Sequence, residues 1–236
     1  MTNVRPQQLN YDKYASSKYD RDIVNSIPFH KELHKEIMKF VEKKFSKYQE
    51  YQVLDLGVGT GLTSKLMQDR LPNAQLEVVD FSRNMLAGAK KRLGTKNVHY
   101  RCVDYAKHLF PKSHYDLVLS VIGLHHQNKK DNHTGTKKMF KKIFNMLKPG
   151  GVFILGDLVT YKDNGVAALN NAKHFAHLVK KSTDEKTLKE WVHHHMYLNH
   201  LAPIEDQITW LKALGFVVTK AFLKLNTGLL ICKKPK

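Results

Sequence analysis

The sequence has 236 residues, of which 42% are hydrophobic, enough to bury one sizeable core. No stretch approaches the ~20 apolar residues of a membrane-spanning helix, and the first residues lack the apolar segment of a secretory signal. These absences exclude a membrane span and predict a cytoplasmic protein. Lysine and arginine (39) outnumber aspartate and glutamate (21), and the resulting charge of +18 favours anionic ligands.

The two cysteines provide a second indication of compartment. Cys102 and Cys232 sit in apolar, strand-like runs and lack the C-x-x-C spacing of redox and zinc sites. We therefore expect both thiols to be buried and reduced, as is usual in the cytoplasm.

The elements between Val53 and Asp157 alternate between short apolar runs and amphipathic segments, which predicts βαβ units and a parallel sheet. Strands are expected at residues 51–57, 75–80, 98–104, 115–123 and 151–159, with helices at 60–70, 83–92 and 135–147. One or two helices are expected over 23–45. A helical stretch follows at 159–203, in which Val166, Leu169, Ala172, Ala176 and Val179 mark one face of the first helix. A last helix at 205–215 precedes two final strands, at 217–224 and 228–234.

A glycine-rich loop follows the first predicted strand, in "VLDLGVGTGL". Glycine at this place lets the chain turn sharply and approach a ligand closely. A phosphate-binding P-loop is excluded, because Leu62 and Thr63 stand where it needs Gly-Lys. Leu62 also replaces the third glycine of a dinucleotide fingerprint, which makes that alternative weak.

Three acids follow or end successive strands. Asp55 lies within the first strand, where an unpaired carboxylate is costly, so it should orient the loop or meet an ammonium group. Asp80 ends the second strand, where it can accept from both hydroxyls of a ribose. Asp104 follows the third strand, where it can accept from the amine of an adenine.

With these residues in order, the sequence resembles the class I S-adenosylmethionine-dependent methyltransferases. The resembling segments are "VLDLGVGTGLTS", "VVDFSRNML", "CVDYA", "YDLVLSVIGLHH" and "LKPGGVFIL". The resemblance implies an α/β fold: a doubly wound, mostly parallel sheet of seven strands in the order 3-2-1-4-5-7-6, Rossmann-like, with N-terminal helices and a helical cap between strands 5 and 6. It implies one methyltransferase domain over 1–236, with a lid (1–50), a cofactor-binding core (51–158), a cap (159–204) and a last helix and two strands (205–236).

The resemblance also implies the cofactor and its site. S-adenosyl-L-methionine would be the methyl donor and S-adenosyl-L-homocysteine the product. The cofactor-binding residues would be Tyr19, Arg21, Asp55, Gly57, Gly59, Gly61, Asp80, Phe81, Met85, Asp104, Tyr105 and Ser120.

Candidate catalytic groups should follow the fourth and fifth strands, beside the methyl group that is transferred. A general base is needed only when the acceptor carries a proton of high pKa. His125 and His126 come directly after the fourth strand, although one of such a pair often only braces the loop. Asp157 and Tyr161 are further candidates. No metal site is predicted, because the histidine spacings match no known ligand motif.

The N-terminal segment "YDKYASSKYDRDIVNSIP" resembles the lid of the carboxy-S-adenosylmethionine synthases, which serve tRNA wobble-uridine modification. Tyr11, Asp12, Tyr19, Ile23, Ser26 and Pro28 fall at that family's spacing. By that resemblance, Tyr19 and Arg21 would close over the cofactor. Trp210, however, stands where those enzymes have an arginine for the additional carboxylate.

The sequence leads to one main function hypothesis and two alternatives. The main one is an enzyme that methylates an O or N atom of a small molecule, anionic if the net charge is a guide. His174, Trp191 and Tyr197 suggest a partly aromatic acceptor pocket. The first alternative is a tRNA-modification enzyme, either an RNA methyltransferase or an enzyme like the carboxy-S-adenosylmethionine synthases, favoured by the net charge and by the lid resemblance. Lys137, Lys138, Lys141 and Lys142 would form a basic stripe on one helix. The second is a non-catalytic partner subunit that binds the cofactor. We expect a monomer or a homodimer with no membrane association.

Overall fold

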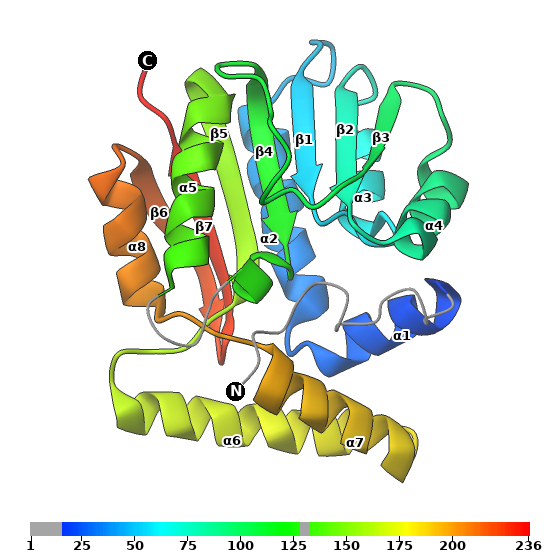
Figure 1. Cartoon of the computed structure of the whole chain (residues 1–236), viewed down its shortest axis with the longest axis vertical. Coiled ribbons are helices and arrows are strands. Elements are labelled where there is room, and N and C mark those ends of the chain that lie inside the picture. Colours follow the sequence, from blue (N-terminus) through cyan, green and yellow to red (C-terminus); the bar gives the residue numbers. More distant parts are fainter. Residues whose placement is uncertain (1–15, 128–132) are drawn as a thin grey trace.

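Seven strands form one sheet in the order β3-β2-β1-β4-β5-β7-β6, as predicted (Figure 1). The computed structural model describes residues 16–127 and 133–236. The first five strands are parallel, and β7 runs antiparallel between β5 and β6. The strands are β1 (Gln52–Leu56), β2 (Gln75–Asp80), β3 (Val98–Cys102), β4 (Tyr115–Val121), β5 (Leu147–Leu158), β6 (Val217–Lys224) and β7 (Thr227–Lys233).

Helices cover both faces of this sheet, which explains why its central strands are apolar on both sides. Leu117, Val118 and Leu119 are consecutive in β4 and all fully buried. One core cluster packs α2, α3 and α4 on one face, and a second packs α5 and α8 on the other. These helices are α2 (His30–Lys44), α3 (Leu62–Arg70), α4 (Arg83–Leu93), α5 (Thr134–Met146) and α8 (Ile204–Ala213).

The remaining helices lie across the edge at which the parallel strands end (Figure 1). They are α1 (Ser16–Ser26), α6 (Asn164–Lys181) and α7 (Glu185–His193), followed by the π-helical turn η4 (His194–Leu198). Side-chain caps start two of them: Asp163 Oδ1 accepts from Val166 N at 2.8 Å, and Asp184 Oδ1 accepts from Thr187 N at 2.7 Å. Together, α1, α6, α7 and η4 cover the edge of the sheet where the loops after β1, β2 and β4 meet, and we call these four elements the cap. No helix in the described ranges is long and apolar enough to cross a membrane.

The apolar face of α6 does not face the rest of the protein. Val166, Leu169 and Val179 are exposed, whereas His174 and Leu178 are buried. The helix therefore turns a face with a histidine inward. The reason is that its inner side lines a cavity, described below, rather than a dry core.

The prediction that both cysteines are buried is wrong for one of them. Cys232 lies in β7, between β5 and β6, and is fully buried. Cys102 ends β3, which is the edge strand of the sheet, and it is exposed. An edge position leaves one side of a strand uncovered, and an apolar run in the sequence does not reveal this.

We predict that a thiol reagent modifies one cysteine of the native protein and two after unfolding. Cys102 should react quickly, while Cys232 is protected both by burial and because burial raises the pKa of its thiol. Titration with Ellman's reagent, with and without guanidinium, measures this. Cys102→Ser should abolish the fast reaction, and two fast thiols would contradict the fold at β7.

Candidate cofactor and acceptor site

A crevice of about 730 Å³ opens at the carboxyl ends of β1, β2 and β4. Strand order reverses between β1 and β4, and a ligand crevice is expected at such a point. Its lining brings together eight of the predicted cofactor-binding residues: Tyr19, Gly57, Gly59, Asp80, Phe81, Met85, Asp104 and Tyr105. Ile122, Gly123, His126, Gln127 and Leu198 complete it.

The glycine loop is held open by a carboxylate of the neighbouring strand. Gly57 and Gly59 have φ of +78° and +55°, a conformation that side chains with a Cβ disfavour. Asp80 Oδ2 accepts from Gly59 N at 2.9 Å, and Asp80 Oδ1 accepts from Ser82 N at 2.9 Å. Each carboxylate oxygen has a second acceptor site, so Asp80 can also receive two hydroxyls of a ligand.

Asp55 lies beneath the loop rather than on the crevice wall. It is almost fully buried, and its Oδ2 accepts from Ser64 Oγ at 2.6 Å. Burial raises the pKa of its carboxyl to about 7. Asp55 lines a hollow of about 420 Å³ that also touches Gly57 and Gly59, so an ammonium group there would stabilise its charged form.

Besides Asp55, three more predicted cofactor-binding residues lie outside the crevice. Ser120 is fully buried, and its hydroxyl donates to Leu56 O at 3.0 Å, which ties β4 to β1. Gly61 caps α3, and a Cβ there would come within 3.3 Å of Leu93, so its conformation serves helix packing. Arg21 points to solvent with 62% of its side chain exposed. Two residues along a helix are about 200° apart, so Tyr19 can face inward only if Arg21 faces outward.

A clamp that the sequence analysis missed holds α1 over the loop. Arg92 of α4 donates to the carboxylate of Asp20 and to the carbonyl of Thr60, and the Thr60 hydroxyl donates to the same carboxylate. The Arg92 and Asp20 side chains are both largely covered. The clamp joins α1, the glycine loop and α4, and so fixes where Tyr19 lies.

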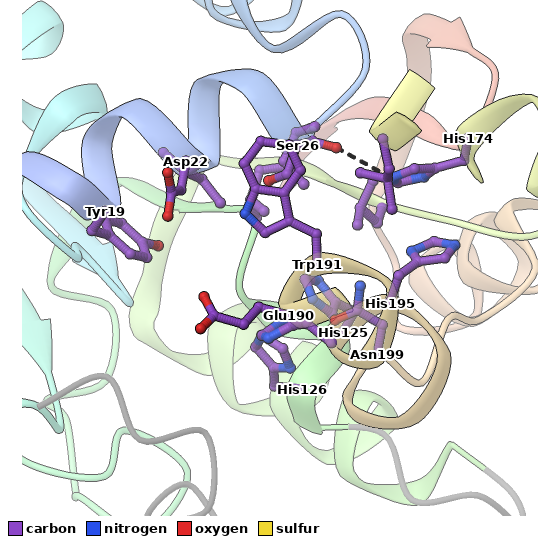
Figure 2. A pocket seen from close by; sticks show the side chains of 16 residues that line it. Tyr19, Asp22, Ser26, His125, His126, His174, Glu190, Trp191, His195 and Asn199 are labelled. Atoms are coloured by element: carbon purple, nitrogen blue, oxygen red, sulfur yellow. Dashed lines mark hydrogen bonds between the residues drawn. The ribbon is translucent and has the colours of Figure 1, made fainter. Parts of the chain in front are cut away.

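A second cavity, of about 700 Å³, adjoins the crevice and lies under α1, α6 and α7 (Figure 2). Tyr19, Ile122 and His126 line both spaces and form their junction. Ile122 has a φ of +53°, which is rare for a β-branched residue and costs on the order of 1–3 kcal/mol. Backbone strain of this kind persists only where the surrounding structure imposes it. Ile122 directly follows β4 and lines both the crevice and the cavity.

His125 and Asp157 form a buried pair on the wall of this second cavity. His125 Nδ1 donates to Asp157 Oδ1 at 2.5 Å, and His125 N donates to Asp157 Oδ2 at 2.9 Å. Leu158 N donates to Asp157 Oδ1 at 2.9 Å, so the carboxylate is well satisfied in its ionised form. The carboxylate fixes the proton on Nδ1, which leaves Nε2 as the nitrogen able to take a proton from a ligand.

The other histidines of the cavity are neutral. Burial and the imidazoles of His125 and His194 hold the pKa of His126 well below its usual range. Burial lowers the pKa of His194 and of His195 to about 4. Both ring nitrogens of His174 are used in hydrogen bonds within the protein. Nε2 donates to Ser26 O at 3.2 Å, and Nδ1 accepts from an Asn226 amide nitrogen.

Two predicted residues lie away from the cavity, and several of its residues were missed. Tyr197 is exposed, and Tyr161 lines a different hollow, where its hydroxyl donates to the Leu225 carbonyl. Trp191 does line the cavity, as expected. The missed lining residues are Asp22, Glu190, His194, His195 and Asn199. The spacing of three between Tyr19 and Asp22 on one helix is a signal that would have found the first.

Comparisons with known proteins agree with this geometry. Residues 53–151 match the family model described as a methyltransferase domain. The chain is 34% identical over 160 residues to the demethylmenaquinone methyltransferase of Leptospira interrogans, which covers 65% of this chain and 61% of that protein. It is 31% identical over 112 residues to the malonyl-acyl-carrier-protein O-methyltransferase of Bacillus cytotoxicus, which covers 48% of this chain and 35% of the relative. The chain thus spans about a third to two thirds of the length of the curated relatives it matches.

Solved structures show the same fold at low identity. The YcgJ protein of Bacillus subtilis superposes with a TM-score of 0.62 at 15% identity, over 88% of this chain and all of that one (100%). The phosphoethanolamine N-methyltransferase 2 of Haemonchus contortus, solved with S-adenosyl-L-methionine, gives 0.59 at 19% identity, over 86% of this chain and 52% of that one. Residues 53–151 thus match a methyltransferase domain, and this match and the relatives support the class I S-adenosylmethionine-dependent methyltransferase family, as the motifs predicted.

We predict that Arg92→Ala loosens α1 without unfolding the sheet. Without the guanidinium, Asp20 keeps only the Thr60 hydroxyl as a partner. Hydrogen exchange should speed up by about tenfold or more over residues 16–26 and stay unchanged in β4. Arg70→Ala, which removes an arginine paired with Glu42 between α3 and α2, is the matched control and should leave α1 protected. Unchanged hydrogen exchange at α1 in the Arg92 variant would show that the clamp does not stabilise the position of α1.

Proposed function

We propose that this chain binds S-adenosyl-L-methionine in the crevice and transfers its methyl group to an O or N atom of a small molecule in the adjoining cavity. The main observation in support of this proposal is that the crevice and the cavity adjoin each other. The crevice and the cavity share Tyr19, Ile122 and His126, and the buried His125–Asp157 pair lies beside it.

The residues of the crevice fit each part of that cofactor. Asp80 presents two carboxylate oxygens for the ribose hydroxyls, and Asp104 presents a carboxylate for the adenine amine. Phe81 and Met85 supply apolar surface for the adenine ring. The hollow beside Gly57 and Gly59, with Asp55 at its base, suits the amino-acid end. When bound, the cofactor supplies a methyl group already activated by a positively charged sulfur.

The protein's own contribution is mainly alignment and exclusion of water. Holding two reactants in line supplies on the order of 7–11 kcal/mol of the barrier. Ile23, Ile27 and Leu178 give the cavity apolar walls beneath the cap helices. His125 Nε2 would accept the proton of an acceptor group, and Asp157 would orient the ring and stabilise its charged form.

The lining also bears on the two tRNA-related activities. Among the residues that the structure describes, neither space is lined by lysine or arginine, so nothing there would meet the additional carboxylate of a carboxylated cofactor. Trp210 packs against His133 and Lys137 instead. The lysine stripe is partly committed too, since Lys142 donates to the carbonyls of Tyr105, Ala106 and His108. We therefore favour methylation of a small molecule that the cap encloses.

We predict that Asp80→Asn weakens the affinity for S-adenosyl-L-homocysteine by about 10- to 100-fold. The variant loses the charge that holds Gly59 and would hold the ribose, and hydrogen bonds to charged groups are worth about 1.5–3 kcal/mol. Isothermal titration calorimetry measures the affinity. Asp69→Asn, at an exposed acid paired with Lys65, should bind as the wild type does. If the wild-type chain binds neither this product nor the methyl donor, the proposed function is wrong.

We predict that His125→Asn lowers kcat by about 10²- to 10⁴-fold and leaves the affinity for S-adenosyl-L-homocysteine unchanged. Asp157→Asn should act in the same direction, because an amide cannot stabilise the protonated ring. The assay is transfer of labelled methyl to a nuclease-treated small-molecule extract. His99→Asn, at an exposed position on β3, is the control. Full activity in the His125 variant would remove the general-base role.

A further inference from the structure

The charges that face the acceptor cavity are opposite in sign to the charge of the chain. The chain carries +18, yet the ionisable side chains lining the cavity are Asp22, Glu190, the phenol of Tyr19 and histidines. Within the described part of the chain no lysine or arginine lines it. Lys18 and Arg21 stand at the margin, with Lys18 Nζ 3.5 Å from Glu190 Oε2 and Arg21 Nε 3.7 Å from Asp22 Oδ1.

The cavity also contains buried hydrogen-bond acceptors that have no partner among the residues that the structure describes. Asp22 is 8% exposed, and its Oδ2 has no partner. His195 is also 8% exposed: its Nε2 donates to Asn171 Oδ1 at 2.8 Å, which leaves Nδ1 as an acceptor without a partner. Asn199 Oδ1 is a third. Buried polar groups are normally paired, so the unpaired Asp22 oxygen points to a ligand that donates, while His195 and Asn199 also line the hollow beside Tyr161.

The two carboxylates act on the same region of the cavity. Figure 2 shows Asp22 and Glu190 on the Tyr19 side of the Trp191 indole. Burial raises the pKa of the Asp22 carboxyl, Lys18 and Arg21 lower it, and the Glu190 charge raises it again. A cation placed between the two carboxylates would relieve both their repulsion and the cost of burying Asp22. The face of Trp191 adds a surface that attracts cations.

We propose, on the basis of the proposed function, that the acceptor is an amine: a primary or secondary amine on an apolar body, held through its N–H groups by Asp22 and Glu190. The apolar body would lie against Ile23 and Leu178. A carboxylate or phosphate group would face two like charges with no lining cation to neutralise it, which disfavours anionic acceptors.

The chemistry of the step supports the same choice. The ammonium form gives one proton to His125 Nε2 and from there to water. The nitrogen lone pair then forms the bond to the methyl carbon, and the electron pair of the broken methyl–sulfur bond stays on sulfur. Positive charge thus develops on the nitrogen, where Asp22 and Glu190 stabilise it. Methylation of a carboxylate or phenolate creates no such charge.

The test compares matched ligands that differ in one group. Phenethylamine, 2-phenylethanol and phenylacetate form one set, and hexylamine, hexanol and hexanoate form another. Each is titrated by calorimetry into the full chain, with and without S-adenosyl-L-homocysteine. We expect at least one amine to bind tenfold or more tightly than its alcohol, its carboxylate not to bind, and labelled methyl to appear as the N-methyl product.

Variants separate recognition of charge from effects on folding. Asp22→Asn should weaken amine binding about 10- to 100-fold and leave the alcohol unaffected. Glu190→Gln should act in the same direction. Glu185→Gln, on the same helix but exposed and paired with Lys189, should change neither. Retained affinity for S-adenosyl-L-homocysteine shows that the variants are folded.

The outcomes distinguish this proposal from the function on which it rests. Equal affinity for amine and alcohol, a preference for the carboxylate, or no amine bound while S-adenosyl-L-homocysteine binds would overturn the amine proposal alone. Loss of S-adenosyl-L-homocysteine binding by the wild type would overturn the proposed function, and titration of the amines without it would still decide what the cavity takes.

Discussion

The constraint on which this structure depends is that β1 and β4 lie side by side while the chain leaves them toward opposite sides of the sheet. Their loops diverge and cannot cover the edge between them, so a crevice opens there. The glycine loop after β1 and the histidines after β4 are brought together only by this reversal. Every functional contact described above, from Asp80 to His125, is on or next to that edge.

Carboxylates organise this edge more than the glycines do. The glycines permit the turn, but Asp80 holds Gly59 and Ser82 in place, and Asp157 holds the backbone and ring of His125. The same type of contact fixes α1, where the Asp20 carboxylate accepts hydrogen bonds from Arg92 and from the Thr60 hydroxyl. A carboxylate that accepts two or three bonds can join segments far apart in the chain, because its oxygens have spare acceptor sites.

How far the sequence predicted this site depends on the distance between the residues that make it. The motifs after β1, β2 and β3 predicted one site for Gly57, Gly59, Asp80 and Asp104, and all four line the crevice, because each lies close to where its strand ends. The strand order also followed from the motifs. Arg21 and Ser120 show the limit, since which way a side chain points depends on helix rotation and on pairing between strands.

The cap was the least predictable part, for a physical reason. An apolar stripe normally marks the buried face of a helix, but α6 turns such a stripe outward because its inner face borders a polar cavity. Similarly, His193, His194 and His195 are consecutive, and on a regular helix neighbouring residues point about 100° apart, which is poor geometry for one shared site. The π-helical turn η4 changes their directions, and His194 and His195 both reach the cavity.

The net charge of the chain likewise does not give the charge inside the cavity. The +18 of the chain acts over the whole surface and describes the field that a distant molecule meets. A ligand within the cavity meets instead the few groups left after burial, where the low dielectric strengthens each contact. Burial keeps His194 and His195 neutral, so the carboxylates of Asp22 and Glu190 set the sign of charge in their part of the cavity. A basic protein can therefore select a cation, provided that its lysines stay outside the site.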